Sequence, residues 1–363
     1  MTWRLCTLRF ITPYVGLASL ITAQASHAAF TQPKAPTNGA QNAPLRGEIT
    51  QGLNDSVTRG LAWLAAKQSP DGAWESGRYG RNAAITALAC LAFLGDGHMP
   101  GRGDYGKVVE KGLDFLLANV NENGLIAADT SHGPMYGHGF ATLFLGEIYG
   151  MLGSGVDSAR AQRLHEALVK AVRLIVQTQN PEGGWRYNPV PFDADLSVTI
   201  CQIMALRSAR NAGLEVPKDT IDRAVSYVRK CQNPDGGFRY QLTSSGSAWP
   251  RSAAGVASLY YAGIYEDQAI DRGLNYLFRV AFPGRRGSPG AHYFYGHYYA
   301  VQTMYLAGGE RWRQWWPAIR DELIAEQRPD GSWDDRQAGV PYGTAMALII
   351  LQMPKRYLPI FQK

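Results

Sequence analysis

Cysteine is scarce in this chain, so disulfides are a poor basis for its fold. Only 4 of the 363 residues are cysteine, and Cys6 falls in an N-terminal segment with the features of an export signal. The other three, Cys90, Cys201 and Cys231, are an odd number without the spacing of a disulfide framework. We expect Cys90 and Cys201 to be buried as small apolar side chains, and the fold not to depend on cross-links.

Neither basic nor acidic residues strongly predominate, and long apolar runs are scarce as well. The formal net charge is +6, and removing Arg4 and Arg9 from the 36 basic residues leaves 34 against 30 acidic ones. No stripe of lysine and arginine with interleaved aromatic residues is present, which argues against nucleic acid as a partner. Beyond residue 28 no apolar segment is long and isolated enough to span a membrane, as expected of a soluble globular chain.

The first 55 residues have the composition of a targeting segment followed by a linker. Residues 1–28 combine Arg4 and Arg9 with a short apolar run and small residues suited to cleavage, which predicts an export signal and a periplasmic or extracellular protein. An uncleaved membrane anchor is the alternative. Residues 29–55, rich in Pro, Asn, Gln and Gly, predict a flexible leader.

A short pattern occurs four times, with Gln and an aromatic residue six positions apart and Pro, an acid and Gly between them. The copies are Gln68–Trp74, Gln179–Trp185, Gln232–Phe238 and Gln327–Trp333. The glutamines are 111, 53 and 95 residues apart, so the period is about fifty residues and indicates a repeat architecture. Two further turns, near Asn119–Leu125 and Phe278–Gly284, lack Gln and the aromatic residue but complete six units.

Each unit reads as an amphipathic helix, the turn, a Gly-rich link and a more apolar helix. The predicted first helices are Val57–Lys67, Val108–Ala118, Glu166–Val176, Ile221–Arg229, Ile270–Phe278 and Trp315–Ala325. The predicted second helices are Ala83–Leu94, His138–Tyr149, Ser197–Ala209, Ala253–Tyr261, His297–Ala307 and Thr344–Leu351. The fold class is therefore all-α: a single closed (α/α)6 toroid over residues 56–355, with outer and inner helices alternating and a tail over 356–363.

The turns are expected to be structural. Pro and Asp end a helix, Gly supplies a conformation that other residues resist, and the aromatic side chain packs back over the turn. The Gln amide is placed to hydrogen-bond the backbone at the neighbouring helix end. These residues are therefore expected to connect adjacent units rather than to perform chemistry.

These repeats resemble those of the prenyltransferase and squalene-hopene cyclase superfamily over roughly Ser56 to Met353. The resemblance implies the α/α toroid, whereas function is less constrained because the fold hosts unrelated chemistries. The zinc ligands of protein prenyltransferases are missing from the matching positions, Tyr295–His297 and Tyr342–Thr344, and no Gly-Cys-Gly-Glu-Gln thioester motif occurs. We therefore expect no metal and no cofactor.

One acidic motif carries the resemblance further. Asp193 and Asp195 follow the turn at Trp185 and match the first two acids of the Asp-x-Asp-Asp motif of squalene-hopene cyclases, while Leu196 replaces the last acid. The resemblance implies that Asp195 is a proton donor and Asp193 its partner, which needs a carboxyl kept protonated by burial. The alternative is a helix cap, because Asp at a helix start accepts backbone N–H bonds.

Two Tyr-Gly-His triplets give the second candidate site. His138 and His297 begin inner helices that stand opposite each other in a ring of six, so they could face one another as general acid and base, or hold a metal together with the aspartates. Ordinary packing at a helix start is the alternative.

The ends of the inner helices should form an aromatic mouth. Candidate ligand-binding residues there are Tyr136, Trp249, Arg251, Tyr295 and Tyr342. We carry three functions: a terpenoid-cyclase-like protein acting on or holding an isoprenoid, a secreted carbohydrate-active enzyme, and a non-catalytic binding or scaffold toroid. The ligand is then a small hydrophobic molecule or a glycan. A protein partner would be one way to cover the mouth, and peripheral contact with a membrane is compatible with the family.

Overall fold

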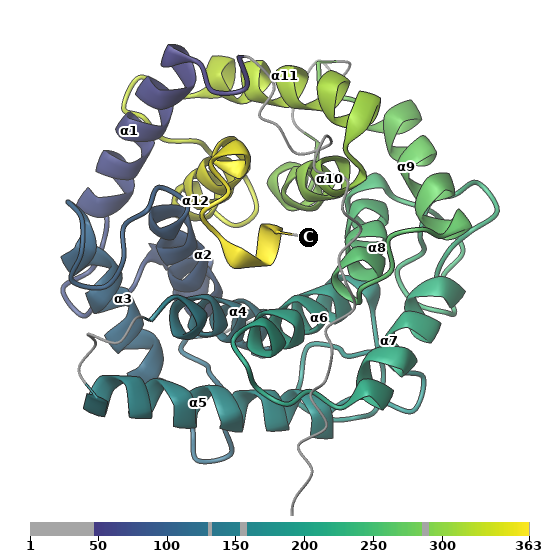
Figure 1. Ribbon diagram of the computed structural model, residues 1–363, viewed down its shortest axis with the longest axis horizontal. Coiled ribbons are helices and arrows are strands. Elements are labelled where there is room, and N and C mark those ends of the chain that lie inside the picture. Colours follow the sequence, from purple (N-terminus) through teal and green to yellow (C-terminus); the bar gives the residue numbers. More distant parts are fainter. Residues whose placement is uncertain (1–46, 130–132, 153–157, 285–289, 363) are drawn as a thin grey trace, which may run out of the picture. The chain divides into compact units, whose positions relative to one another are not determined.

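The chain forms six helical hairpins, each made of one helix of an outer ring and one helix of an inner ring (Figure 1). The computed structural model describes residues 47–129, 133–152, 158–284 and 290–362. The outer helices are α1 (Gln51–Ala66), α3 (Gly106–Ala118), α5 (Ser158–Gln177), α7 (Lys218–Lys230), α9 (Gln268–Val280) and α11 (Gly309–Glu326). The inner helices are α2 (Ala83–Leu94), α4 (Met135–Met151), α6 (Leu196–Asn211), α8 (Trp249–Tyr261), α10 (Tyr293–Ala307) and α12 (Val340–Leu351). The predicted (α/α)6 toroid is confirmed.

The inner helices are largely apolar, as expected of helices that are covered on both faces. In α2 only Ala84 is not fully buried. Each predicted helix overlaps an observed one, but most inner helices begin several residues earlier than predicted; α10, for example, starts at Tyr293 instead of His297. Their first turns contain Gly and large aromatic residues, which hide the helical periodicity. Outside the helices, β1 (Glu75–Ser76) and β2 (Gly80–Arg81) flank the short 3-10 helix η1 (Gly77–Tyr79).

The repeated turns connect adjacent units as predicted. Gln179 Nε2 donates to the carbonyl of Gly183 in its own turn at 2.8 Å and to that of Thr220, in the first turn of α7, at 2.9 Å. The indole N–H of Trp185 donates to the carbonyl of Ile175 in α5 at 2.7 Å. The same pair of glutamine bonds is made by Gln68 to Gly72 and Val108, by Gln232 to Gly236 and Ala269, and by Gln327 to Gly331 and Ser56.

The last of these turns closes the ring. Gln327 Nε2 donates to the carbonyl of Ser56 in α1 at 2.9 Å, and the Ser56 hydroxyl donates back to Gln327 Oε1 at 2.8 Å. Because α11 and α1 are thereby joined by the same bonds that join successive units, the array has no open terminal face.

The first helix begins before the predicted end of the leader. Thr50 caps α1 by accepting the N–H of Leu53 at 3.1 Å, and Glu48 is buried, accepting the indole N–H of Trp312 at 2.6 Å. The predicted flexible leader, 29–55, is therefore too long at its C-terminal end. The predicted export signal and residues 29–46 lie outside the described residues. None of the helices in the described ranges combines the length and the apolar character needed to cross a membrane.

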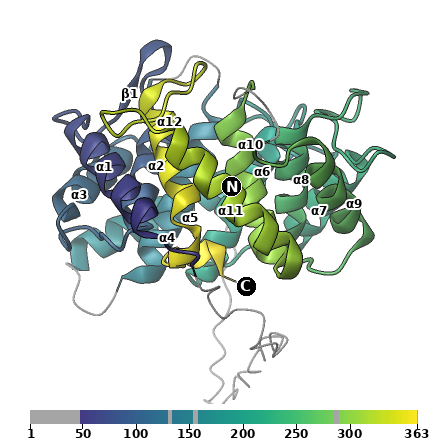
Figure 2. The same ribbon diagram turned by 90° about the horizontal axis from the view of Figure 1, so that it is seen from above.

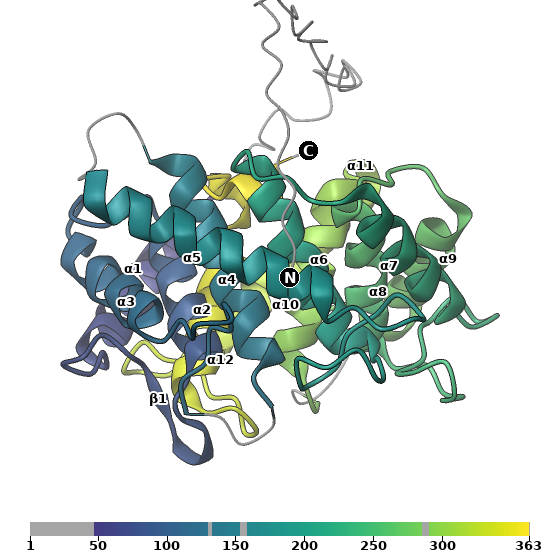
Figure 3. The same cartoon turned by 90° about the horizontal axis from the view of Figure 1, so that it is seen from below.

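The C-terminal segment packs inside the inner ring (Figure 1), at the end opposite to β1 (Figures 2 and 3). It contains the 3-10 helices η2 (Met353–Lys355) and η3 (Pro359–Phe361). The N–H of Ile360 donates to Glu147 Oε2 at 2.9 Å, and the Ser208 hydroxyl donates to Glu147 Oε1 at 2.7 Å. Glu147 is 1% exposed, and burial raises the pKa of its carboxyl to about 7.

This buried carboxyl predicts a pH dependence of stability. Because its folded-state pKa is raised, the contribution of Glu147 is fully present at low pH and is lost as the pH rises from about 4.5 to about 7. In Glu147→Gln the amide oxygen can accept from Ile360 and the NH2 can donate to Ser208, whose proton can turn to the carbonyl of Leu143, 3.2 Å away. We expect the variant to match wild type near pH 4.5 and to exceed it at pH 8 by about 2–3 kcal/mol.

Urea denaturation of both proteins between pH 4.5 and pH 8 measures this difference, and all other titrating groups cancel in it. Parallel stability profiles for the two proteins would contradict the raised pKa of Glu147.

Candidate functional site

A cavity of about 390 Å³ opens at the end of the toroid where the inner helices begin. Its wall is largely aromatic, formed by Tyr79, Tyr136, Phe140, Tyr187, Tyr295 and Tyr342. Its polar lining residues are Asn82, Asp129, His292, Asp335 and Gln337. The volume and the mixture of apolar wall with few polar groups are typical of a small-molecule site.

Three of the five predicted ligand-binding residues, Tyr136, Tyr295 and Tyr342, line this cavity. They stand in the first turns of α4, α10 and α12. The Tyr295 hydroxyl donates to the carbonyl of Ser197 at 3.2 Å, which fixes the ring against α6. Burial raises the pKa of all three phenols well above the ordinary value, so the wall is uncharged at neutral pH.

The other two predicted ligand-binding residues do not line the cavity. Trp249 is 8% exposed and packs against His297, with ring centroids 4.8 Å apart. Arg251 donates from Nε to the carbonyl of Phe238 at 3.0 Å and from a terminal nitrogen to that of Gly246 at 2.7 Å. The prediction that they face the ligand is wrong, because the first turn of α8 points them at neighbouring backbone and at α10.

The two histidines do not face each other across the mouth, which corrects that prediction. His138 Nδ1 accepts the N–H of Ile126 at 3.1 Å and its Nε2 lies 3.2 Å from the carbonyl of Ala171 in α5, so both ring nitrogens contact backbone. Burial lowers the pKa of His138 to about 4. His297 packs between Trp249 and Trp315, with Trp315 coming from α11. Each ring thus points outward, between an inner and an outer helix.

Asp195 stands at the N-terminal end of α6, outside the cavity lining. Its side chain is fully buried, and Oδ1 caps α6 by accepting the N–H of Val198 at 2.9 Å. Oδ2 has no hydrogen-bond partner within the described part of the chain, although Arg186 Nε lies 3.7 Å away. Burial raises the pKa of the carboxyl to about 6, although the bond from Val198 and the charge of Arg186 oppose the shift.

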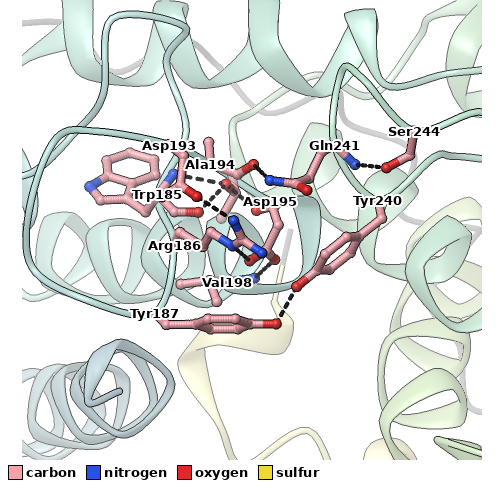
Figure 4. Close-up of polar contacts among 11 residues, drawn as sticks. Trp185, Arg186, Tyr187, Asp193, Ala194, Asp195, Val198, Tyr240, Gln241 and Ser244 are labelled. Atoms are coloured by element: carbon pink, nitrogen blue, oxygen red, sulfur yellow. Dashed lines mark hydrogen bonds and ion pairs between the residues drawn. The ribbon is translucent and has the colours of Figure 1, made fainter. Parts of the chain in front are cut away.

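Arg186 joins the two aspartates of the motif. Its guanidinium binds Asp193 and lies beside Asp195 (Figure 4). Asp193 is partly exposed, with 37% of its side chain accessible. Neither aspartate lines the cavity. The sequence motif therefore folds into a buried acid, an arginine and a second, partly solvated acid.

Two tyrosines lie between Asp195 and the cavity. The Tyr240 hydroxyl lies near the Asp195 carboxyl and favours its ionised form. The same hydroxyl is hydrogen-bonded to that of Tyr187, which lines the cavity (Figure 4). Burial above all, with a smaller contribution from the charge of Asp195, raises the pKa of Tyr240 well above its ordinary value.

Two acids that line the cavity were missed by the sequence analysis. Asp335 is 8% exposed, and its Oδ1 accepts the N–H groups of Gln337 at 2.9 Å and of Ala338 at 2.7 Å. Asp129 pairs with Arg81 at 3.4 Å. Asp335 follows the fourth turn by two residues, but no recurring motif marked it. Among the described residues no group of three or more His, Cys, Asp or Glu is placed to hold a metal ion.

Comparison with known proteins supports the fold. No protein-family model matches the chain. Drimenyl diphosphate synthase of Streptomyces showdoensis is 25% identical over 193 residues, which are 53% of this chain and 33% of that protein. The match therefore spans about a third of the length of this curated relative.

Two solved structures cover most of this chain. The type II terpene cyclase MstE from Scytonema, in complex with geranylgeranyl dihydroxybenzoate, is 15% identical with a TM-score of 0.57 and matches over 85% of this chain and 98% of its own. An inactive α-1,6-mannanase variant of Salegentibacter, in complex with α-1,6-mannotriose, is 7% identical with a TM-score of 0.63 over 83% and 98%. The predicted terpene-cyclase-like α/α toroid is confirmed as a fold.

Proposed function

We propose that this protein binds an isoprenoid ligand in the aromatic cavity and protonates it with Asp195 as the acid. The observation that carries the proposal is the Asp195 carboxyl, which is fully buried, has a pKa raised to about 6 and lies beside the Tyr240 hydroxyl. A carboxyl of this kind keeps its proton up to a higher pH than an ordinary aspartate, as a general acid requires. The aromatic wall suits an apolar chain and the cations formed from it.

The equivalent helix start in the first unit supports a role for Asp195 beyond helix capping. In the first unit Asn82 caps α2 by accepting the N–H of Ala84 at 2.9 Å. Asn82 stands four residues before Thr86, whose hydroxyl oxygen accepts the N–H of Trp74. The third unit repeats this arrangement around Asp195, with Thr199 and Trp185. Because a neutral amide caps the equivalent helix, the ionisable group at Asp195 is not required by the fold.

The tyrosine pair offers a route for the proton. In the proposed step the Tyr187 hydroxyl gives its proton to a terminal alkene carbon of the ligand. Tyr187 is reprotonated by Tyr240, and Tyr240 by Asp195, which leaves a carboxylate beside Arg186. The cation then closes a ring and loses a proton to a base, so the net change is an isomerisation. Asp195 regains its proton from solvent.

Binding is tested first, with geranylgeraniol as the probe and with thermal stabilisation and calorimetry as the readouts. We expect saturable binding that is lost in Ala84→Phe, because Ala84 lines the cavity and the phenyl ring would fill it. The matched control is Ala62→Phe, on the exposed face of α1, which should bind like wild type. Incubation in D2O is expected to yield a cyclised isomer with one deuterium on carbon.

Absence of binding by the wild-type protein, or equal binding by Ala84→Phe, would remove the isoprenoid proposal. Binding without any deuterated isomer would leave a binding protein and reject Asp195 as an acid catalyst.

A second candidate is a carbohydrate-active toroid. Asp129 and Asp335 both line the aromatic cavity, and paired carboxylates with stacking aromatics are what glycoside hydrolysis uses. The mannanase of the same fold adds support. Saturable binding of α-1,6-mannotriose, sensitive to Ala84→Phe, would favour this candidate over the first.

We also propose that the protein is exported to the periplasm or the exterior by residues 1–28. The support is the charge and composition of that segment alone. N-terminal sequencing of the protein from its host would reveal a start near residue 29 if the signal is removed.

A further inference from the structure

Two of the polar residues that line the cavity in the described part of the chain are acids. Asp129 and Asp335 contribute carboxylates, whereas no lysine or arginine belongs to the lining in the part of the chain that the structure describes. Arg81, which pairs with Asp129, also pairs with Asp71 at 3.1 Å. A ligand group that approaches Asp129 or Asp335 therefore meets hydrogen-bond acceptors with negative charge.

Asp335 is held in a fixed orientation. Its Oδ1 accepts the backbone N–H groups of Gln337 and Ala338, at 2.9 and 2.7 Å, in the loop before α12. Both of these bonds end on Oδ1, which leaves Oδ2 to accept from a ligand. The negative charge of Asp335, together with the larger effect of burial, raises the pKa of the wall residue Tyr342. Asp335 therefore acts electrostatically on the cavity wall, and its low exposure limits screening by water.

We propose that the ligand of this cavity presents a hydroxyl or ammonium group to Asp335, and that prenyl diphosphates are disfavoured. The inference rests on the proposed isoprenoid function and specifies its substrate class. A carboxylate accepts hydrogen bonds from hydroxyl and ammonium groups and pairs with a cation, whereas a diphosphate brings only negative charge and acceptor oxygens. The cavity then selects a neutral or cationic prenyl compound, in contrast to the diphosphate named for the curated relative.

The contacts of Asp335 allow its charge to be removed by a substitution that preserves the local structure. In Asp335→Asn the amide oxygen can take over the two bonds made by Oδ1, as Asn82 does at the start of α2. The substitution therefore removes the charge and keeps the loop. Asp219→Asn is the matched control, because Asp219 lies on α7 with 80% of its side chain exposed.

Binding is measured by calorimetry at pH 8, where histidines are generally neutral, with three probes: geranylgeraniol, geranylgeranylamine and geranylgeranyl diphosphate. We expect wild type and Asp219→Asn to bind the alcohol and the amine at least ten-fold more tightly than the diphosphate. Asp335→Asn is expected to reduce that preference about ten-fold, mainly through tighter binding of the diphosphate.

Each other outcome has a distinct meaning. Equal or tighter binding of the diphosphate by wild type would overturn this inference while leaving the isoprenoid proposal standing. A preference for the alcohol that is unchanged in Asp335→Asn would overturn the role of Asp335. Binding of none of the three prenyl probes would reject the isoprenoid function, and the inference with it.

Discussion

Asp195→Asn is expected to reduce formation of the deuterated isomer a hundred-fold or more while leaving the fold intact. Asparagine can accept the Val198 N–H as Asp195 does, and the chain already uses Asn82 for the same purpose in α2. What it cannot do is donate a carboxylic proton, and a positioned general acid is worth about 10²–10⁴ in rate. Turnover in D2O and a thermal melt on the same preparation separate the two effects.

Asp195→Ala is compared with Asp195→Asn to separate the loss of the acid from the loss of the helix cap. Alanine removes both the acid and the cap, so we expect the same loss of turnover together with about 0.5–2 kcal/mol of lost stability. Tyr240→Phe keeps the acid and breaks the hydrogen bond to Tyr187, so it is expected to slow the same step without lowering affinity for geranylgeraniol. Full turnover in Asp195→Asn would reduce this residue to a helix cap.

The protonation state of Asp195 can be checked without any substrate. Burial raises its pKa to about 6, so wild type should show an infrared carbonyl band of a protonated carboxyl at pH 5 that fades by pH 7.5. The band should be missing from Asp195→Asn, and the difference between the two proteins isolates it from Glu147. A carboxyl that is ionised throughout this range would contradict the proposed mechanism.

The repeat pattern predicted the fold because each copy encodes a local structure and a contact with the next unit. Gln, Gly and the aromatic residue recur at fixed offsets, and the bonds of Gln179 to Gly183 and Thr220 are the contacts this spacing suggests. The residues at which the inner helices begin were harder to predict from the sequence. The first turns of α8 and α10 are built from residues such as Trp249 and Tyr295, whose size does not reveal a helical phase.

The candidate site was only partly predictable, because a residue's position at a helix start does not fix the direction of its side chain. Tyr136 reaches the cavity, whereas His138, two residues later, turns outward to the backbone of α5. Asp335 was missed because it lies in a link where no motif recurs. Its importance comes from the loop that brings it beside Tyr342.

Gly183→Ala is expected to be the most destabilising single-methyl change in the turn of the third unit. Gly183 has φ +101°, and a Cβ there would lie 2.2 Å from the carbonyl oxygen of Arg223 in α7. The left-handed conformation costs alanine about 1–2 kcal/mol, and overpacking against helical backbone adds about 1–3 kcal/mol. We expect the free energy of unfolding to fall by about 2–5 kcal/mol, measured by urea denaturation.

Gly213→Ala separates the two contributions. Gly213 has a similar φ of +90°, but no atom of the described residues lies within 4 Å of the place that an alanine methyl group would take there. Only the conformational cost of about 1–2 kcal/mol should therefore appear. A larger loss at Gly183 then measures the close approach of turn and helix. The glycines of the other turns lie against the next outer helix in the same way, because a Cβ added at each would lie 2.2 to 2.7 Å from a carbonyl oxygen: Gly72, Gly124, Gly236 and Gly331. Gly124 belongs to a unit without the Gln and the aromatic residue, so the close approach is the feature of the turn that this unit keeps. Equal losses at Gly183 and Gly213 would mean that the turns are held by their glutamine bonds and not by contact of the backbones.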